Sequence, residues 1–443
     1  MDFDAFKEAC FSEAAARGCG DAEIYYAQST SSSVDVLEGA VESYEVNTDG
    51  GANLRVKYDG KSGYAFTQKL DEPDKLVIRA IDNAMAVETA DEQPMQGKSE
   101  YRTISRPQKR ADELTNDGRT ELALELERTA KAADSRVVRV MTCTVAEQQT
   151  RIRISNTRGL DAADESRIAF AVLAPVTKVE DDVRTAYAFR TGDEIFDIDA
   201  LAAQAVANSV MQHGGAPVAA GKYRVLIRND AMTELIAAFS PMFSGEAAQK
   251  GLTLFADKLG EKIAADILTI TDDPLLKGRE RPFDGEGVPS VMTKVVDKGV
   301  LRSFLYDLKS AKKAGVASTS NGGRAGAAAP VSVMPSNFFI EPGVESYDAL
   351  VEKLEDGLVI TSMSGMHAGL STVSGEFSLI ASGLLVEGGR VVRPVEQITV
   401  GGSFVELISS VTDIGCDAYW SMPGKSSFSA PSMLFEGLMV SGK

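Results

Sequence analysis

Histidine is scarce in this sequence: among 443 residues there are only two, His213 and His367, and they lie far apart. A catalytic zinc site commonly takes three protein ligands drawn from histidine, cysteine and carboxylate side chains. Neither histidine has a second one within a helical turn, so the sequence contains no H-E-x-x-H pair. We therefore predict that this chain does not build a catalytic transition-metal site of its own.

The two histidines have different surroundings in the sequence. His213 follows an expected helix and precedes the glycine-rich segment 214–221, so we interpret it as a solvated residue or one that interacts with the helix dipole. His367 lies in a loop between Gly365 and Gly369. A binding role and a purely structural role for His367 are equally consistent with this pattern.

Cysteine and long apolar runs are also rare. The four cysteines have no paired spacing, which is typical of a reducing compartment where cysteine packs as a small apolar residue. No run reaches the roughly 18 consecutive apolar residues that would span a bilayer, and the acidic start Met1–Asp4 is unlike a secretory signal. We expect a cytoplasmic protein that does not cross a membrane. The cysteines are Cys10, Cys19, Cys143 and Cys416.

Positive charge is in deficit. The chain has 46 Lys and Arg residues against 64 Asp and Glu residues, a net charge of −18, and its densest basic stretch, Arg106–Arg110, holds only three cations. Such a polyanion is repelled by nucleic acid and by anionic lipid. Direct binding to either partner is therefore not expected.

Patterns for nucleophilic catalysis are weak. The sequence has no G-x-S-x-G motif, and Ser310 with Lys313 forms an S-x-x-K pattern without its S-D-N and K-T-G companions. A hydrolase that uses Ser310 and Lys313 is the weakest hypothesis. The acidic segments 272–274 and 284–286 match no EF-hand loop, and we interpret them as ordinary turns.

A glycine-rich segment, 321–326, is neither a Walker A loop nor a dinucleotide-binding motif. Glycine permits close backbone approach. We therefore expect Gly322 and Gly323 to lie against another strand or an extended peptide.

The pattern of residues predicts an α+β protein with a boundary at 214–221. Residues 1–213 should form an N-terminal domain of two β-meanders with packed helices, joined by a polar linker at 89–118. Helices are expected at 4–17, 72–87, 119–133 and 197–211. Strands are expected within 22–67 and at 137–145, 151–155, 167–178 and 184–190, with 137–145 and 151–155 paired.

Residues 222–443 should form a mainly antiparallel β domain with glycine-shaped loops and few helices. Strands are expected at 223–227, 267–271, 303–307, 358–362, 377–386 and 398–400. Helices are expected at 231–238, 348–354 and 404–411.

An ordered series of motifs runs through residues 223–420. It comprises D-K-L-G at 257–260, D-D-P at 272–274, F-D-G-E-G at 283–287, G-V-L at 299–301, S-A-K at 310–312, P-S-N at 335–337, G-x-H at 365–367, S-G-E-F-S at 374–378, P-V at 394–395 and I-G-x-D at 414–417. The series resembles the TldD/PmbA family, and its details resemble the PmbA (TldE) branch. The helix, meander and linker of the first half suit the N-terminal domain of that family.

The resemblance also shows where this chain departs from its metal-binding relatives. In the family, the TldD subunit carries H-E-x-x-x-H on a helix and a later cysteine that completes the metal site. An ungapped comparison places Ile236 and Pro241 at the two histidine positions, Ala237 at the glutamate position and Pro423 near the cysteine position. Isoleucine has no lone pair for a metal, and alanine cannot transfer a proton. This departure agrees with the PmbA branch.

The resemblance implies an intracellular zinc-dependent peptidase assembled from TldD-like and PmbA-like subunits. Such a peptidase acts on unfolded peptides, and the family's older label is modulator of DNA gyrase. This chain would be the non-catalytic partner that supplies one wall of the substrate chamber, with zinc held only in the partner. Strand addition is a suitable mode of peptide recognition. Gly322, Gly323, Gly365, His367 and Gly369 are the expected peptide-binding residues.

A second hypothesis comes from a different functional class. The chain could act alone as a homodimeric peptide-binding or regulatory protein without hydrolytic activity. Mixing with a TldD-like partner and measuring the mass of the complex discriminates between the two hypotheses.

Overall fold

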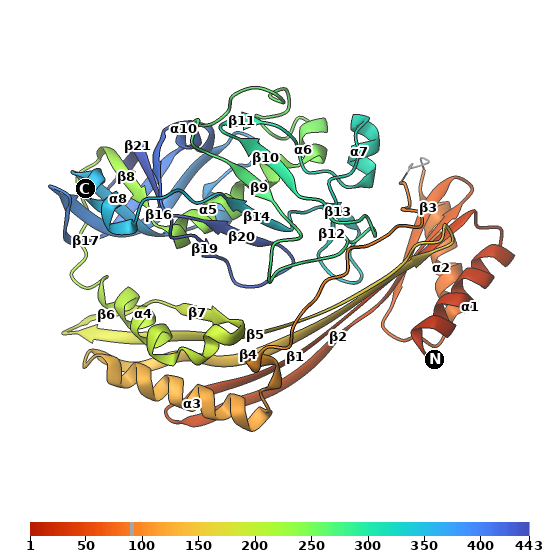
Figure 1. Cartoon of the computed structure of the whole chain (residues 1–443), viewed down its shortest axis with the longest axis horizontal. Helices are drawn as coiled ribbons and strands as arrows, with labels where there is room; N and C mark the ends of the chain where they lie inside the picture. The colour runs from red at the N-terminus through yellow and green to blue at the C-terminus, as the bar shows by residue number, and fades with distance from the viewer. Residues whose placement is uncertain (89–92, 443) are drawn as a thin grey trace.

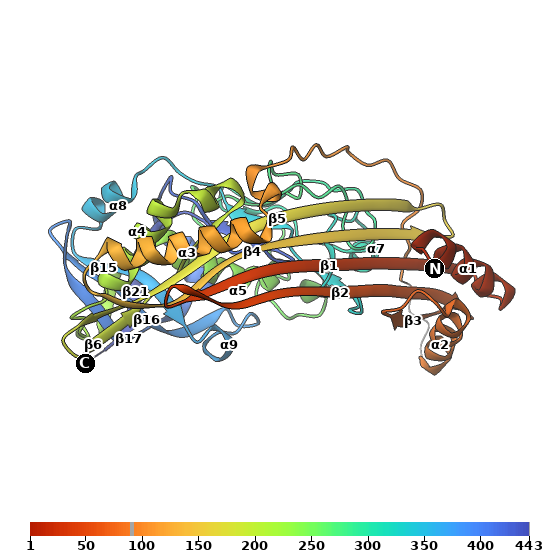
Figure 2. The same ribbon diagram turned by 90° about the horizontal axis from the view of Figure 1, so that it is seen from below.

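The computed structural model of the chain describes residues 1–88 and 93–442 (Figure 1). The first half contains one antiparallel sheet in the order β3-β2-β1-β4-β5-β6, with β7 paired to β5. Figure 2 shows that its long central strands run side by side along the molecule. The strands are β1 (Asp21–Leu37), β2 (Ala40–Tyr58), β3 (Lys61–Thr67), β4 (Val137–Asn156), β5 (Asp161–Val179), β6 (Asp182–Thr185) and β7 (Ala188–Thr191).

The expectation of paired strands at 137–145 and 151–155 is wrong, because both segments belong to the single 20-residue strand β4. The polar residues between them resemble a turn in the sequence. They continue the strand because the equally polar part of β1 pairs with them, from Ser29 opposite Thr150 to Ser33 opposite Ala146. This β1–β4 ladder joins the two expected meanders into one sheet.

Two helices pack at each end of the long sheet (Figure 1). At one end, α1 (Phe3–Ala16) and α2 (Pro73–Ala86) cover a core that includes Phe6 and Leu54. At the other end, α3 (Asn116–Ala133) and α4 (Ile198–Val210) cover a core that includes Leu126 and Leu201. All four helices were expected, with ends within three residues of those observed. Within the expected linker, residues 89–92 lie outside the described residues, and 93–109 have no regular secondary structure.

The second half is built around a sheet in the order β17-β16-β15-β8-β21-β18. An additional pairing of β17 with β21 closes five of these strands into a ring. The pairing of β8 with β15 is parallel, and the other pairings in this sheet are antiparallel. The strands are β8 (Gly221–Ile227), β15 (Gly357–Ser364), β16 (Glu376–Glu387), β17 (Arg390–Ser403), β18 (Val411–Ile414) and β21 (Met433–Ser441).

A second sheet in this half has the order β11-β10-β9-β14-β20-β19, and β12 pairs separately with β13. The short helices of this half lie around the sheets. The strands are β9 (Ile270–Asp272), β10 (Thr293–Asp297), β11 (Val300–Leu301), β12 (Gly322–Arg324), β13 (Val331–Val333), β14 (Asn337–Ile340), β19 (Tyr419–Trp420) and β20 (Ser427–Ala430). The helices are α5 (Asn229–Phe239), α6 (Gly245–Gln249), α7 (Leu308–Ala314), α8 (Tyr347–Leu354), α9 (Met366–Gly369) and α10 (Phe404–Ser409). The expected α+β class, with a β-rich second half and few helices, is confirmed.

The expected strand at 303–307 is wrong. Leu305 instead exchanges hydrogen bonds with the irregular segment before α6, from its own N–H to Phe243 O at 2.9 Å and from Gly245 N–H to its carbonyl at 2.8 Å. The apolar run at 304–306 is buried, and within residues 1–88 and 93–442 its pairing is limited to an isolated bridge between Leu305 and Ser244.

The largest core lies between the closed ring and the second sheet, and α5 contributes one of its walls. The rings of Phe239 and Phe404 stack with centroids 4.3 Å apart, and those of Phe243 and Phe338 are 5.7 Å apart. These aromatic residues pack α5 against α10, and the turn after α5 against β14 of the second sheet. None of the helices in the described part of the chain is long and apolar enough to cross a membrane.

Candidate functional site

The helix α5 and the turn that follows it carry three of the positions singled out in the sequence, and the helix was expected from residues 231–238. It begins after Arg228 with Asp230 in its first turn and ends before the short helical turn η3 (Ser240–Phe243). Pro241 has no N–H to donate and restricts the residue before it, which explains why the α-helix stops there. The hydrophobic side of α5 faces the core, and its other side faces outward.

The three positions differ in their environment. Ile236 is fully buried in the main core, Ala237 is half-buried and Pro241 is exposed. None of the three side chains offers an atom that binds zinc. In residues 1–88 and 93–442, no group of three or more His, Cys, Asp or Glu side chains could hold a metal ion.

The segment near Pro423 joins β19 to β20, and this hairpin packs on α5 through Thr233. The Thr233 hydroxyl donates to the carbonyl of Tyr419 at 3.0 Å and accepts from the N–H of Ala430 at 2.9 Å. Residues about 190 positions apart in the chain thus meet in one place. The structure therefore brings together the two segments in which the resemblance places the family's metal ligands, although Ile236, Ala237, Pro241 and Pro423 offer no such ligand.

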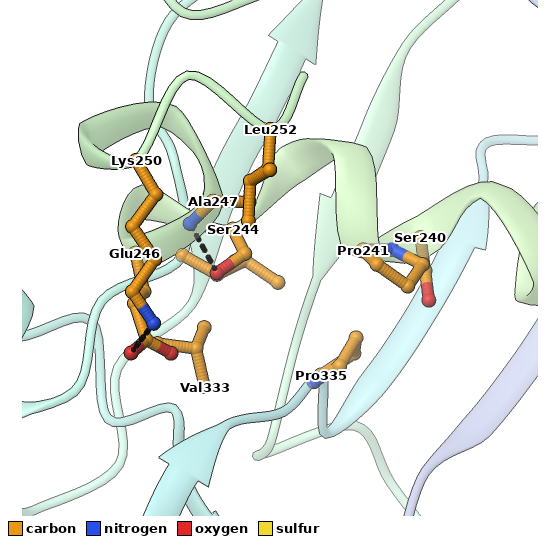
Figure 3. Close-up of a pocket in the computed structure, with 10 residues that line it drawn as sticks. Ser240, Pro241, Ser244, Glu246, Ala247, Lys250, Leu252, Val333 and Pro335 are labelled. Carbon is orange, nitrogen blue, oxygen red and sulfur yellow. Dashed lines mark hydrogen bonds and ion pairs between the residues drawn. The ribbon is translucent and has the colours of Figure 1, made fainter. Parts of the chain in front are cut away.

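A pocket of about 190 Å³ lies beside the end of α5 (Figure 3). Its polar groups already have partners within the wall. Glu246 and Lys250 form an ion pair at 2.6 Å, and the Ser240 hydroxyl donates to the carbonyl of Ala237 at 2.8 Å. The Ser244 hydroxyl accepts from the N–H of Ala247 at 3.3 Å and caps α6. The lining residues are Ser240, Pro241, Ser244, Glu246, Ala247, Lys250, Leu252, Leu305, Val333 and Pro335.

The opposite wall of the pocket is the hairpin of β12 and β13, which buried carboxylates hold in place. Asp284 accepts from the N–H of Gly322 at 2.9 Å, and Gly322 accepts from the N–H of Gly285 at 2.7 Å. Asp272 accepts from the side-chain amide of Asn321 at 2.7 Å and from the N–H of Ser336 at 2.8 Å. The two ends of the hairpin are thus tied to the acidic segments.

Burial changes the acidity of these carboxyl groups, because a low-dielectric interior disfavours the charged form. Burial raises the pKa of Asp272 to about 6. It also raises the pKa of Asp284 and of Glu286, and the charge of Asp284 raises the pKa of Glu286 further. The interpretation of 272–274 and 284–286 as ordinary turns therefore missed that their carboxyl groups hold the β12–β13 hairpin by hydrogen bonds. The place of these segments in the ordered motif series was the only sequence signal for this role.

The long sheet supports the same hairpin through Arg324. Its guanidinium lies 4.5 Å from the ring centroid of Tyr25 and 3.9 Å from Glu23. Glu23 also forms a buried ion pair with Arg55 at 2.9 Å. The N-terminal sheet therefore contacts the hairpin through a buried cluster of charges, and no pattern in the sequence indicated this contact.

The expected peptide-binding residues lie in two separate elements, and their role stays a prediction. Gly322 and Gly323 lie in β12, and a Cβ atom at Gly323 would come within 2.5 Å of the Met334 side chain. The other three residues, Gly365, His367 and Gly369, lie at α9, beside the closed ring of strands. The strands β12 and β13 belong to a separate two-stranded sheet. His367 is exposed, and a Cβ at Gly369 would meet the carbonyl of Ser378 at 2.4 Å. The glycines of both segments permit close backbone packing within the chain.

Of the two interpretations of His213, the solvated one is wrong, and an interaction with the dipole of α4 stays a prediction. Its side chain is 8% exposed, with Nδ1 at 3.1 Å from a carboxylate oxygen of Asp182 and Nε2 at 2.8 Å from the hydroxyl of Thr177. Thr177 is fully buried in the sheet, so a substrate cannot reach its hydroxyl. We therefore interpret this Thr–His–Asp arrangement as structural.

Ser310, the residue of the weakest hypothesis, is also buried. It forms a capping box with Asp307 at the start of α7, whereas Lys313 is exposed. A hydroxyl engaged in this way supports a capping role. Burial also raises the pKa of Cys10 and of Cys143 to about 12, which fits their expected role in packing.

Comparison with known proteins places the whole chain among its relatives. Models of the PmbA/TldA metallopeptidase family match residues 22–84 (domain 1), 109–212 (central domain) and 220–442 (C-terminal domain). The metalloprotease PmbA of Escherichia coli O157:H7 is 24% identical over 433 residues, covering 95% of this chain and 92% of that protein.

Two crystal structures have closely similar folds. One is a Thermotoga maritima protein described as a candidate modulator of a DNA gyrase, with a TM-score of 0.90, 32% identity and coverage of 99% of this chain and 100% of that chain. The other is TldE from Thermococcus kodakarensis, with a TM-score of 0.90, 22% identity and coverage of 99% and 100%.

Proposed function

Because the chain belongs to the PmbA/TldD metallopeptidase family, as its motif series predicted, we propose that it is a PmbA/TldE-like subunit of a TldD–TldE-type peptidase. In this proposal the chain is not catalytic. It supplies part of the chamber in which unfolded peptides are cleaved, and a TldD-like subunit holds the zinc. We further propose that the complex works in the cytoplasm.

The observation that carries this proposal is the chemistry of α5 and the β19–β20 segment. A zinc peptidase needs lone-pair donors on the metal and a group that moves protons. The positions inferred for these functions hold Ile236, Ala237, Pro241 and Pro423, which supply neither. Ile236 is also part of the main core, where its side chain packs against other apolar residues. The residues of this chain therefore do not fit zinc.

The fold supports a role for this chain other than holding zinc. The scaffold that brings α5 and the β19–β20 segment together is retained, with Thr233 hydrogen-bonded to both strands of the hairpin. A pocket also remains beside the helix end. A subunit that keeps the scaffold and the pocket but lacks the metal ligands is suited to position a peptide for a partner.

The test uses the full chain alone and mixed with a TldD-like protein that carries H-E-x-x-x-H. Metal analysis of the isolated chain should find no stoichiometric zinc, and the isolated chain should cleave no unfolded peptide. Mixing should give a complex of defined mass that cleaves such peptides. The variant Cys416→Ser removes the one cysteine that is exposed among the described residues, so it controls for adventitious metal bound by a surface thiol.

Two results would contradict the proposal. Stoichiometric zinc together with peptide cleavage by the isolated chain would make the chain itself the catalyst. A homodimer that ignores the TldD-like protein would favour the alternative, a stand-alone peptide-binding protein. A control mixture whose TldD-like protein lacks its metal-binding histidines should form the complex without cleaving peptide.

A further inference from the structure

A chain of hydrogen-bonded polar side chains lies where the first half of the molecule meets the second. Residues 211–220 connect α4 to β8 there and form neither a helix nor a strand (Figure 1). His213 belongs to this connection, and its ring packs on the end of the N-terminal sheet. We call the following six residues the junction network: Thr177, Asp182, Arg184, Ser209, His213 and Glu396.

The hydrogen bonds of Ser209 and Thr177 determine whether Nε2 of His213 carries a proton. The Ser209 hydroxyl donates to the carbonyl of Arg184 at 3.0 Å, because a carbonyl can only accept. The contact between the Ser209 and Thr177 hydroxyls at 2.7 Å therefore uses the proton of Thr177. The Thr177 oxygen has no second proton to give, so it accepts from Nε2 of His213 at 2.8 Å. Nε2 consequently carries a hydrogen.

The other ring nitrogen of His213 faces a carboxylate. Nδ1 lies 3.1 Å from Oδ2 of Asp182, and the same oxygen accepts from the N–H of Gly214 at 3.2 Å. Burial acts to raise the pKa of Asp182, but hydrogen bonds, including those from Gly214 and Arg184, outweigh it and lower that pKa. An ionised carboxylate only accepts, so Nδ1 carries a hydrogen as well. Both ring nitrogens therefore donate, which requires the positively charged imidazolium.

Asp182 also connects His213 to the second half of the molecule. Its Oδ1 lies 2.6 Å from Nε of Arg184, and the same guanidinium forms an ion pair with Glu396 in β17. Gly215 packs so closely on Glu396 that a Cβ atom at this glycine would come within 2.8 Å of the Glu396 Cγ. The protons on His213 thus affect a contact between the N-terminal sheet and the closed ring of strands.

The other charged groups near the ring do not replace its charge. Asp134, after the end of α3, is paired with Arg136 at 2.6 Å. The hydrogen bonds from Arg136 and, to a smaller extent, the charge of His213 lower the pKa of Asp134 to about 2. On β5, Lys178 projects to the face of the sheet opposite the ring, because side chains alternate along a strand. Residues 200–212, which include most of α4, contain no charged side chain.

Loss of one ring proton leaves the junction network incomplete. While His213 is protonated, the two positive and the two negative side chains of the network balance. Without the Nδ1 proton, a nitrogen lone pair faces the carboxylate of Asp182. Without the Nε2 proton, the hydroxyl of Thr177 faces two acceptors, the ring and Ser209, with a single proton. Either arrangement sets two acceptors against each other, which is unfavourable in a site largely closed to water.

We propose that the junction network is a proton-dependent latch between the two halves of the molecule. The latch is closed while His213 is an imidazolium. It opens as rising pH removes one ring proton, because Asp182 then moves away from the ring and releases Arg184 and the N–H of Gly214. Histidine is the side chain whose charge ordinarily changes near neutral pH, which suits it to this role. The latch is a property of the isolated chain, so its test needs no TldD-like partner.

The protonation state is measured by NMR on the full chain labelled with nitrogen-15 in histidine only. The chain has two histidines, so the spectrum contains two rings, and the variant His367→Gln assigns them. Near pH 7, both ring nitrogens of His213 should carry protons. A His213 ring with one unprotonated nitrogen at this pH would overturn the proposal.

The variant Ser209→Ala tests the order of donors directly. It removes the acceptor of the Thr177 proton, so Thr177 can donate to Nε2 and a neutral ring satisfies both of its partners. The pH midpoint at which His213 loses a proton should therefore fall by about one unit, the effect of about one hydrogen bond. The control Asn208→Ala changes the neighbouring position of α4, whose side chain contacts Arg228 instead, and should leave the midpoint unchanged. Equal midpoints in the wild-type chain and in Ser209→Ala would contradict the proposal.

Opening of the latch is measured by hydrogen exchange, with rates corrected for the intrinsic effect of pH. The N–H groups of residues 213–215 all have internal acceptors. Their protection should fall at least about tenfold between about pH 6 and pH 9, while circular dichroism shows the chain folded at both values.

A matched pair of variants assigns this effect to one histidine. His213→Gln should abolish the dependence of protection on pH, because a glutamine side chain does not titrate. His367→Gln makes the same change at the exposed histidine and should retain the dependence. Protection that does not change with pH in the wild-type chain, or an equal change in His213→Gln, would show that no such latch exists.

Discussion

The two walls of the pocket are held in place by different forces. The helical wall, formed by α5, η3 and α6, rests on apolar packing of Ile236, Phe239 and Phe243 in the main core. The hairpin wall, formed by β12 and β13, rests on hydrogen bonds from its main chain and from Asn321 to Asp272 and Asp284. Apolar packing does not depend on protonation, whereas a buried carboxyl group is sensitive to it.

The two walls of this pocket therefore differ in what stabilises them. A wall built from aromatic packing is rigid and insensitive to its chemical surroundings. A wall held by buried polar groups has its geometry specified by hydrogen bonds, and each bond has one required partner. We expect the two walls to respond differently to substitution and to pH. Four experiments test this expected difference.

The largest effect is expected at the helical wall. Phe239→Ala should lower the free energy of unfolding by about 3–5 kcal/mol, because it removes a fully buried ring and leaves a cavity. Denaturant titration at two pH values should show the same loss at both. The control Val344→Ala alters a side chain that is 90% exposed and should change stability by less than about 0.5 kcal/mol.

At the hairpin wall, Asp272→Ala should cost about 2–3 kcal/mol, because two buried donors lose their acceptor. Those donors are the amide of Asn321 and the N–H of Ser336. Hydrogen exchange should accelerate across residues 321–336 and remain unchanged in α5. Asp272→Asn retains an acceptor oxygen and should cost less. Equal exchange in the two variants would show that hydrogen bonding does not hold the hairpin.

The stability of the hairpin wall should decrease as pH rises. Burial raises the folded-state pKa of Asp272 to about 6 from the usual 3.8 of an aspartate, so the folded chain binds more protons than the unfolded chain in this window. The contribution of Asp272 is complete below about pH 4 and is lost as pH rises through about 6.

Glu286 has a raised pKa as well and extends the same trend to higher pH. The free energy of unfolding should therefore fall by about 2 kcal/mol more between pH 5 and pH 8 in the wild-type chain than in Glu286→Gln, whose amide does not titrate. Parallel pH profiles for the two proteins would contradict this assignment.

The smallest effect is expected outside both walls, at the two histidines. His213→Ala removes hydrogen bonds to Thr177 and Asp182 and should cost about 1 kcal/mol, because Thr177 retains a contact with Ser209 at 2.7 Å. His367→Ala changes an exposed side chain and should have no measurable effect on stability. A larger loss at His367 would mean that its loop has a structural role that its exposure does not reveal.

Local patterns in the sequence were sufficient for several elements. The apolar spacing in residues 231–238 predicted α5, and the four helices of the first half were expected close to their observed ends. The continuous strand β4 was not expected, because its polar middle resembles a turn until β1 pairs beside it. A short polar segment gives no local indication of the strand that will lie next to it.

The candidate site was only partly visible in the sequence. The motif series predicted the family, and the family models confirm it. That Ile236, Ala237 and Pro241 stand where relatives hold metal ligands and a proton-transfer group stays a prediction. The pocket could not be predicted, because its walls come from segments about 90 residues apart, such as Pro241 and Val333. Gly322 and Gly323, expected to contact peptide, lie in β12, the strand paired with β13 at the pocket.

The sequence alone determined which side chains are available, including only two histidines, because a metal ligand or proton-transfer group must be present as a residue before any fold can position it. Only the tertiary structure decided which acidic turns become buried anchors. Burial and hydrogen-bond partners depend on segments far apart in the chain, and Asp284 with Gly322 is one example.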